Sequence, residues 1–179
     1  MTSFLTEEEL KLLGLKSYGH NVLISRKTSI YGAQNISIGN NVRIDDFCIL
    51  SGNITIKSNI HISSYVALYG QLGIILEDFT GISSKSIIYS AMDDFGGDYL
   101  IGPIHPDGTT RVTGGLVKLC KYSQIGAGCI VFPTVTISEG SVVGAMSLIK
   151  SNTEPWSIYA GIPAKKIKDR NNRLLNQEY

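Results

Sequence analysis

The sequence contains too few cysteines, histidines and long apolar runs for several common kinds of protein. Three cysteines, an odd number, and three histidines offer little material for a disulfide framework or a metal centre. No apolar run approaches the roughly 20 residues that a membrane-spanning helix requires. The acidic segment Glu7-Glu8-Glu9 stands where a secretory signal would carry basic and then apolar residues. These absences predict a cytoplasmic protein with reduced thiols and no membrane span.

The sequence also has little charge. Its formal net charge is +1 and charged residues make up 17%, so no electrostatic attraction to nucleic acid or an anionic membrane is expected. Nineteen glycines accompany 43% hydrophobic residues, a mixture that suits many short strands joined by tight corners. A length of 179 residues fits one domain, which we assign to residues 1–179.

Aliphatic side chains recur every six residues over most of the chain. The first series is Ile38, Ile44, Leu50, Ile56, Ile62 and Leu68, and it resumes two residues out of step at Leu76, Ile82 and Ile88. The second series is Leu119, Ile125, Val131, Ile137, Val143 and Ile149. Six is neither the period of an amphipathic helix nor that of an alternating strand, so this internal repeat is the strongest guide to the fold.

A six-residue repeat is typical of a short strand followed by a turn. Three such hexads make one triangular coil of about 18 residues, and successive coils stack at the parallel-strand spacing of about 4.8 Å. One coil cannot bury its own apolar face, whereas a stack of coils can. The sequence therefore predicts an all-β parallel β-helix over residues 22–90 and 117–152, with the aliphatic series inside.

Three segments leave the hexad pattern. Residues 6–15 have the capping-box spacing of Thr6 and Glu9 and predict a short helix that closes one end of the prism. Residues 91–116, rich in Gly, Pro and Asp, form an excursion loop whose length indicates either a function or disorder. In the C-terminal segment 154–179, a turn at Gly161 precedes a basic helix expected from Ala164 to Leu175.

The hexads resemble those of the hexapeptide-repeat acyltransferase superfamily. Residues 161–168, Gly-Ile-Pro-Ala-Lys-Lys-Ile-Lys, are similar to the ending of its sugar and xenobiotic acetyltransferases. Residues 81–98 resemble a subgroup linked to surface polysaccharides, some members of which acylate amino groups of nucleotide-linked deoxysugars. The resemblance implies a left-handed helix and a homotrimer with active sites between subunits. It also implies transfer of an acyl group from coenzyme A to a hydroxyl or amino group of a sugar. We expect the acyl group to be acetyl and the sugar to be nucleotide-linked. The resemblance places this reaction in lipopolysaccharide O-antigen or capsule biosynthesis.

Acyl transfer from a thioester needs a group that accepts the proton of the nucleophile. His61 immediately precedes the anchor Ile62, so we expect it to point outward at a corner, beside the corner carrying residues 81–84 one coil later. His105 lies in the excursion and loosely resembles the loop base of galactoside and maltose acetyltransferases, although its surroundings differ. Asp94 is a third candidate, because a carboxylate can orient a histidine or hold an amino group. The choice among these three stays open at this point, as does that between O- and N-acylation.

Other residues are candidates for binding the two substrates. We expect the sugar to contact Ser84, Asp93 and Asp98. We expect the pantetheine arm of coenzyme A to contact the backbone at Gly126, Ala127, Gly144 and Ala145, where glycine permits close approach. The donor phosphates would meet basic side chains of the C-terminal segment, namely Lys165, Lys166, Lys168 and Arg170.

Two other functions fit a hexapeptide prism. A γ-type carbonic anhydrase needs three imidazoles around zinc, two of them close in sequence, whereas His20, His61 and His105 are over forty residues apart. We therefore expect no metal. A non-catalytic scaffold or binding protein is the stronger alternative, but it would not need the polar excursion or the basic ending. The acceptor sugar and the length of the acyl chain are not fixed by the sequence.

Overall fold

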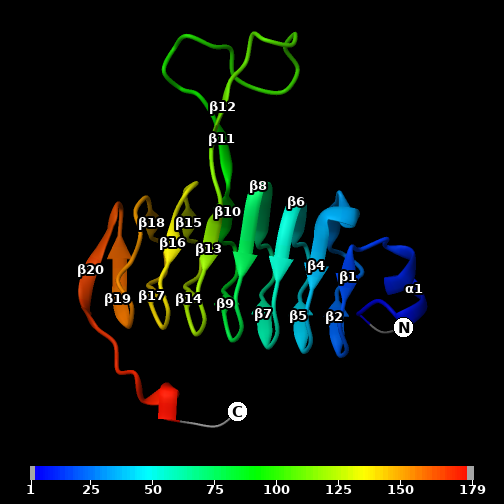
Figure 1. The fold of residues 1–179 in the computed structure, drawn as a ribbon, viewed down its shortest axis with the longest axis vertical. Coiled ribbons are helices and arrows are strands. Elements are labelled where there is room, and N and C mark those ends of the chain that lie inside the picture. The colour runs from blue at the N-terminus through cyan, green and yellow to red at the C-terminus, as the bar shows by residue number, and fades with distance from the viewer. Residues whose placement is uncertain (1–2, 177–179) are drawn as a thin grey trace.

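Short parallel strands wind into a left-handed β-helix in the computed structural model, which describes residues 3–176. Figure 1 shows the coils side by side, from α1 at one end to β20 at the other, with a ribbon rising from the middle. The predicted all-β parallel architecture is confirmed.

Each coil contributes one strand to each of three faces. The first face contains β2 (Val22–Ile24), β5 (Val42–Ile44), β7 (Ile60–Ile62), β9 (Gly81–Ile82), β14 (Gln124–Ile125), β17 (Val142–Val143) and β19 (Ser157–Gly161). The second face contains β3 (Ser29–Tyr31), the first halves of β6 (Ile49–Ile56) and β8 (Ala67–Leu76), β10 (Ile87–Tyr89), β15 (Ile130–Val131) and β18 (Leu148–Ile149). The third face contains β1 (Ser17–Tyr18), β4 (Ile36–Ile38), the second halves of β6 and β8, β13 (Val117–Leu119) and β16 (Thr136–Ile137). A 3-10 turn, η1 (Ala33–Asn35), precedes β4.

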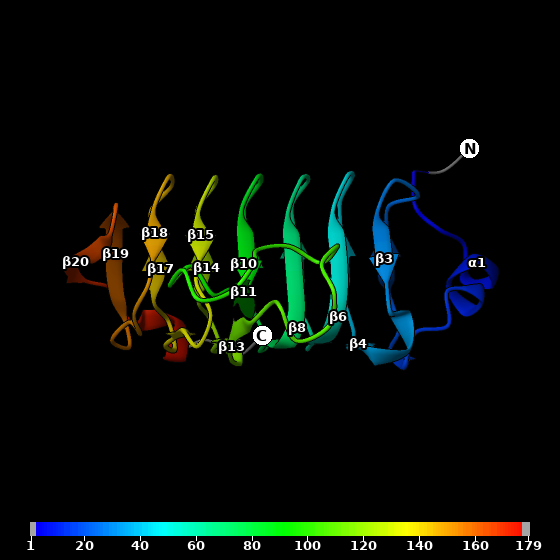
Figure 2. The ribbon, with the colours of Figure 1, turned by 90° about the horizontal axis from the view of Figure 1, so that it is seen from above.

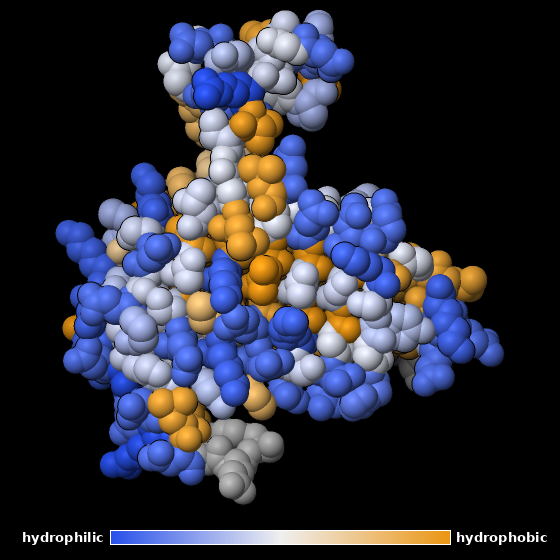
Figure 3. All heavy atoms as spheres, viewed as in Figure 1, coloured by the Kyte–Doolittle hydropathy of each residue, from blue (hydrophilic) through white to orange (hydrophobic). Residues whose placement is uncertain are grey.

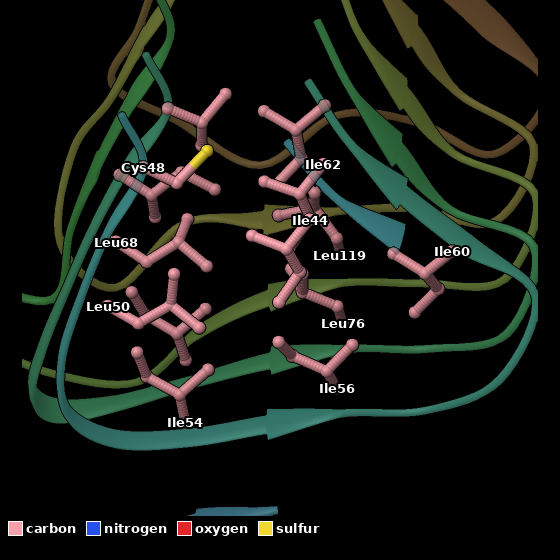
Figure 4. Packing of buried hydrophobic residues seen from close by; sticks show 14 of the residues in the cluster. Ile44, Cys48, Leu50, Ile54, Ile56, Ile60, Ile62, Leu68, Leu76 and Leu119 are labelled. Carbon is pink, nitrogen blue, oxygen red and sulfur yellow. The ribbon is translucent and has the colours of Figure 1, made fainter. Parts of the chain in front are cut away.

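The aliphatic series fills the interior, as predicted. Ile44, Ile62, Leu68 and Leu76 are fully buried and stack on their counterparts in neighbouring coils (Figure 4). The two residues that break the period lie between Gly70 and Ile74, because Gly52 pairs with Gly70 while Ile54 pairs with Ile74. The additional residues are thus absorbed at a corner, and the register of the buried side chains is kept.

The corners require backbone conformations that ordinary residues adopt at a cost. Asn21, Asn41 and Asn59 occupy equivalent corners with φ of 52°, 53° and 60°. Their side chains form a ladder in which Asn21 Nδ2 donates to Asn41 Oδ1 and Asn41 Nδ2 donates to Asn59 Oδ1, each at 3.1 Å. These coil-to-coil hydrogen bonds help to offset the strain.

Helix α1 (Glu7–Leu12) covers the first coil and confirms the predicted cap, although it is shorter than residues 6–15. Thr6 and Glu9 make both hydrogen bonds of the capping box. Leu10 is buried against the prism, whereas Leu12 is 86% exposed.

The C-terminal helix expected from Ala164 to Leu175 was a wrong prediction. Ala164–Asp169 forms strand β20, which pairs antiparallel with β19, and only a 3-10 turn, η2 (Arg173–Asn176), follows. The last coil would otherwise expose the hydrogen-bonding edge of β19, and β20 covers that edge.

The excursion is anchored by a two-stranded ribbon, here called the stalk. Strand β11 (Ala91–Asp93) pairs antiparallel with β12 (Val112–Gly114). The stalk rises from the corner between the second and third faces, and Figure 2 shows its loop lying above the middle coils.

Candidate functional site

The predicted site residues lie in separate parts of the chain. Two of them, His61 and Ser84, lie on or beside the first face. The stalk and its loop carry Asp93, Asp94, Asp98 and His105. The four residues expected to bind the donor backbone, from Gly126 to Ala145, lie on later coils. Figure 1 shows β7 near the base of the prism and the stalk projecting from the opposite side. One chain therefore does not bring His61 and Asp94 together.

His61 lies in the middle of strand β7 and not at a corner, so that part of the prediction was wrong. Its side chain nevertheless points outward and is 53% exposed. The ring Nε2 lies 2.7 Å from Asp45 Oδ2, and Arg43 Nε lies 2.7 Å from Asp45 Oδ1. Arg43 pairs with His61 across β5 and β7, so the three side chains form one cluster on the first face.

The Asp45 carboxyl remains ionised in this cluster. Its partial burial raises the pKa, but the hydrogen bonds from Arg43 and His61 outweigh that effect, and the pKa ends below its usual range. Neither Asp45 nor Arg43 was a candidate in the sequence. The repeat could have predicted that Arg43 lies beside His61, because the two residues are one coil of 18 residues apart.

A polar hollow of about 290 Å³ adjoins His61 on the first face. His61 pairs with Gly81, as expected from its place one coil before the segment 81–84. A Cβ atom at Gly81 would lie 2.3 Å from Gln124 Oε1, so the glycine leaves the room in which Gln124 lies. The hollow is lined by Asn59, His61, Ser63, Phe79, Thr80, Gly81, Ile82, Ser83 and Gln124.

Ser84 lies at the corner that follows β9. Its carbonyl accepts a hydrogen bond from Gly128 N at 2.9 Å, which fixes the backbone to the next coil. Within residues 3–176, no side chain or backbone group hydrogen-bonds the Ser84 hydroxyl, so the hydroxyl is available to a ligand.

The Asp94 carboxylate is held in place at the top of the stalk. Gly96 N donates to Asp94 Oδ1 at 2.8 Å, and Arg111 Nε lies 3.8 Å from Asp94 Oδ2. The backbone N–H of Asp94 also donates to the Arg111 carbonyl at 2.8 Å. His105 lies farther along the loop, where its Nε2 is 3.1 Å from the Ile101 carbonyl. Asp94 is therefore the better fixed of the two loop candidates.

An open, mainly apolar pocket of about 620 Å³ lies where the stalk meets the second face. Asp93 lines it, whereas Asp98 lines a smaller hollow within the loop. The pocket brings together aromatic and aliphatic side chains that no pattern in the sequence groups, namely Tyr89, Met92, Phe95, Val112, Ile130 and Phe132.

The glycines that we expect to contact coenzyme A are also needed for the close stacking of neighbouring coils. A Cβ at Gly126 would lie 2.6 Å from Ala145 N, and one at Gly144 would lie 3.1 Å from the Ala160 Cβ. Gly126 N donates to the Val143 carbonyl at 2.8 Å. Glycine at these positions therefore has a structural reason apart from any ligand.

The basic C-terminal residues divide into two groups. Lys166 forms ion pairs with Glu154 at 2.6 Å and Asp169 at 2.8 Å, and these carboxylates raise its pKa. Arg170 Nη1 donates to the carbonyls of Tyr122 and Gly140. Lys165 and Lys168, by contrast, take part in no ion pair within the part of the chain that the structure describes.

Residues 3–176 contain no group of three or more His, Cys, Asp or Glu side chains placed to hold a metal ion. They also contain no helix that is long and apolar enough to cross a membrane.

A comparison with known sequences finds relatives along nearly the whole chain, although no protein-family model matches it. The dTDP-4-amino-4,6-dideoxy-D-glucose acyltransferase of Escherichia coli is 44% identical over 179 residues, which cover 98% of this chain and 93% of that protein. A putative lipopolysaccharide biosynthesis O-acetyl transferase of Escherichia coli, WbbJ, is 27% identical over 145 residues, which cover 80% of this chain and 73% of that protein.

Solved structures of one N-acyltransferase superpose closely on the chain. AntD from Bacillus cereus, in complex with dTDP and 3-hydroxybutyryl-CoA, gives a TM-score of 0.95 with 53% identity, covering 98% of this chain and 94% of AntD. An AntD variant with a substituted serine, in complex with dTDP-4-amino-4,6-dideoxyglucose and coenzyme A, also gives a TM-score of 0.95, with 52% identity and coverage of 98% and 95%. Other AntD structures carry a substituted aspartate.

Proposed function

The chain belongs to the hexapeptide-repeat family of sugar acyltransferases, and from this premise we propose that it acylates the amino group of a dTDP-linked 4-amino-4,6-dideoxy sugar. It is a coenzyme A-dependent sugar acyltransferase. We choose an amine as the acceptor because this chain is similar to two proteins that act on or bind such amino sugars. The identities are 44% and 53% over nearly the whole chain.

We assign the proton transfer to His61. An amino sugar is largely protonated at neutral pH, so it loses one proton to solvent before it attacks a thioester, and the attacking nitrogen must then lose a second proton to become an amide. An imidazole titrates near pH 6.5 and an aspartate near pH 4, so an imidazole is the better base at neutral pH. The outward ring and the adjoining hollow support this role for His61. Asp94, a fixed carboxylate, would hold and orient the amino group.

The bond changes follow from this assignment. The neutral amine nitrogen attacks the thioester carbonyl carbon and forms a tetrahedral intermediate. Its surplus proton passes to the imidazole, the carbon–sulfur bond breaks, and the departing thiolate receives the proton. The products are an amide and free coenzyme A. The unpaired Ser84 hydroxyl is suited to donate a hydrogen bond to the developing oxyanion.

Because His61 and Asp94 are apart in one chain, we propose that the site forms between subunits of a homotrimer. The stalk region carries exposed apolar side chains, including Phe95, Val112 and Ile104, the last 89% exposed. Figure 3 shows apolar side chains in a band that runs from the stalk onto the prism. Such an extended patch favours a protein contact, and a neighbouring first face would complete the site.

For the donor, we propose that coenzyme A lies along the coils of Gly126, Ala127, Gly144 and Ala145. Its phosphates would meet Lys165 and Lys168, which make no ion pair with described residues. We place the reaction in the cytoplasm, since all three cysteines are free thiols. We further propose a role for the product in a surface polysaccharide such as O-antigen or capsule.

The test is an assay of thiol release with acetyl-CoA and with 3-hydroxybutyryl-CoA. Each donor is offered dTDP-4-amino-4,6-dideoxyglucose, and the matched control acceptor carries a 4-hydroxyl in place of the amine. We expect thiol release and an amide product only with the amine. Release with the hydroxyl acceptor alone would replace this proposal with O-acylation.

A further inference from the structure

Asp45 is the best fixed member of the cluster on the first face. Both of its carboxylate oxygens are engaged, Oδ1 by Arg43 Nε and Oδ2 by His61 Nε2, each at 2.7 Å. Its backbone N–H donates to the Ile62 carbonyl at 2.9 Å, which ties the corner to the coil that carries His61. The Asp45 side chain is 20% exposed, against 53% for His61. The carboxylate is therefore a fixed support for a more exposed ring.

The contact determines which nitrogen of the imidazole carries the hydrogen. An ionised carboxylate only accepts hydrogen bonds, and the pKa of Asp45 lies below its usual range. Nε2 must then be the donor. In the neutral ring the lone pair is therefore on Nδ1, the nitrogen that remains able to take a proton.

Arg43 supports the same arrangement from the previous coil. Its guanidinium lies over the Phe4 ring, 5.3 Å from the centroid, and also binds Asp45. An arginine keeps its charge at any relevant pH, so it keeps the carboxylate ionised and prevents it from turning away from His61.

The adjacent Asp46 provides a natural comparison. It belongs to the same corner, but its carboxylate accepts from Ser25 Oγ and from Lys27 Nζ, the latter at 3.0 Å. These partners lie on the preceding coil, and none of them contacts His61. Asp45 therefore contacts the His61 ring, whereas Asp46 does not.

We propose that Asp45 is a positioning residue, which holds His61 in the tautomer and orientation that let Nδ1 take the proton from the acceptor amine. This proposal rests on the function proposed above. Asp45 itself touches neither substrate in this scheme, and it acts through His61 alone.

The test is a double-mutant cycle in the full-length protein, with kcat measured at saturating acyl-CoA and amino sugar. Asp45→Asn preserves shape but offers an amide that can donate to Nε2 and favour the wrong tautomer. We expect it to lower kcat by about 10-fold or more, with the KM for acyl-CoA unchanged. In a His61→Ala background, Asp45→Asn should lower kcat no further. Asp46→Asn, the matched control, should leave kcat within about twofold of wild type.

The outcomes separate this inference from the proposed function. If the wild-type protein acylates no amino sugar, the proposed function fails. If it is active and Asp45→Asn matches Asp46→Asn in kcat, the positioning role is overturned while the function stands. An equal loss of kcat from Asp45→Asn with and without His61 would assign Asp45 a purely structural role and would likewise overturn the proposal. Melting temperatures of all variants identify any that fail to fold.

Discussion

Asp45 and His61 belong to successive coils, and their side chains meet at 2.7 Å between Oδ2 and Nε2 on the outside of the prism. The same two coils are also joined by backbone hydrogen bonds, by the Asn41–Asn59 side-chain hydrogen bond and by the stacked rings of Phe47 and Tyr65. An ionised, doubly anchored carboxylate beside an exposed imidazole is the arrangement from which the chemistry proposed here proceeds.

The first prediction concerns the proton acceptor. His61→Ala should lower kcat by about 10²- to 10⁴-fold, because a general base contributes that much, and should change donor binding little. His105→Ala, the control in the loop, should cost less than about 10-fold. Steady-state kinetics with both substrates varied gives the result. Near-normal turnover of His61→Ala at saturating substrate would favour Asp94 as the only residue that assists the amine.

The second prediction concerns the site between subunits. His61→Ala and Asp94→Asn should each be nearly inactive alone. When the two variants are mixed before assembly, some contacts will join an intact His61 to an intact Asp94. Random mixing in equal amounts makes this true of roughly one site in four, so activity should recover to about a quarter of wild type. Activity that stays at the level of the separate variants would show that both residues act within one chain.

The third prediction concerns the register of the core. Ile137 is fully buried, whereas the neighbouring Thr136 points outward from β16. Ile137→Asp should cost several kcal/mol, since it buries an unpaired carboxylate. Thr136→Asp should be mild unless this position touches another subunit. Equal melting temperatures for the two variants would contradict the register.

The fourth prediction concerns the basic C-terminal hairpin. Lys165→Glu combined with Lys168→Glu should raise the KM for acyl-CoA, with a smaller change in kcat, because remote phosphates are bound equally in ground and transition states. Lys166→Gln removes the ion pairs with Glu154 and Asp169 and should mainly lower the melting temperature. An unchanged donor KM in the Lys165/Lys168 variant would mean that this hairpin does not bind the phosphates.

The fifth prediction concerns acid stability. Partial burial raises the pKa of Glu77, but its hydrogen bonds with Lys118 and the backbone of Lys121 prevail, and the folded pKa is below its usual value. Glu77 should therefore stabilise the fold above the unfolded glutamate pKa of about 4.3, and this contribution should be lost as pH falls through the lower folded value. The melting temperature of Glu77→Gln should accordingly differ from wild type at pH 7 and approach it at acid pH. A constant difference across this range would rule out ionisation as the cause.

The buried interior was determined by the sequence alone. A hexad anchor such as Ile62 or Ile137 is placed by its own period, because each coil repeats the local geometry of the one before it. The same spacing places Arg43 beside His61, one coil apart. The capping helix could likewise be predicted from the sequence, because Thr6 and Glu9 form both hydrogen bonds of a capping box within four residues.

Only the tertiary structure decided the rest. Residues 164–169 are rich in helix-forming Ala and Lys, yet they form β20 because β19 offers an unpaired edge that no sequence period reveals. Whether Asp45 or Asp46 turns toward His61 depends on the corner, where one carboxylate faces the preceding coil and the other the following one. The distance between His61 and Asp94 in one chain depends on which corner of the prism carries the stalk. A repeat specifies what recurs from coil to coil, whereas corners, edges and excursions occur once, and their geometry comes from contacts between segments distant in sequence.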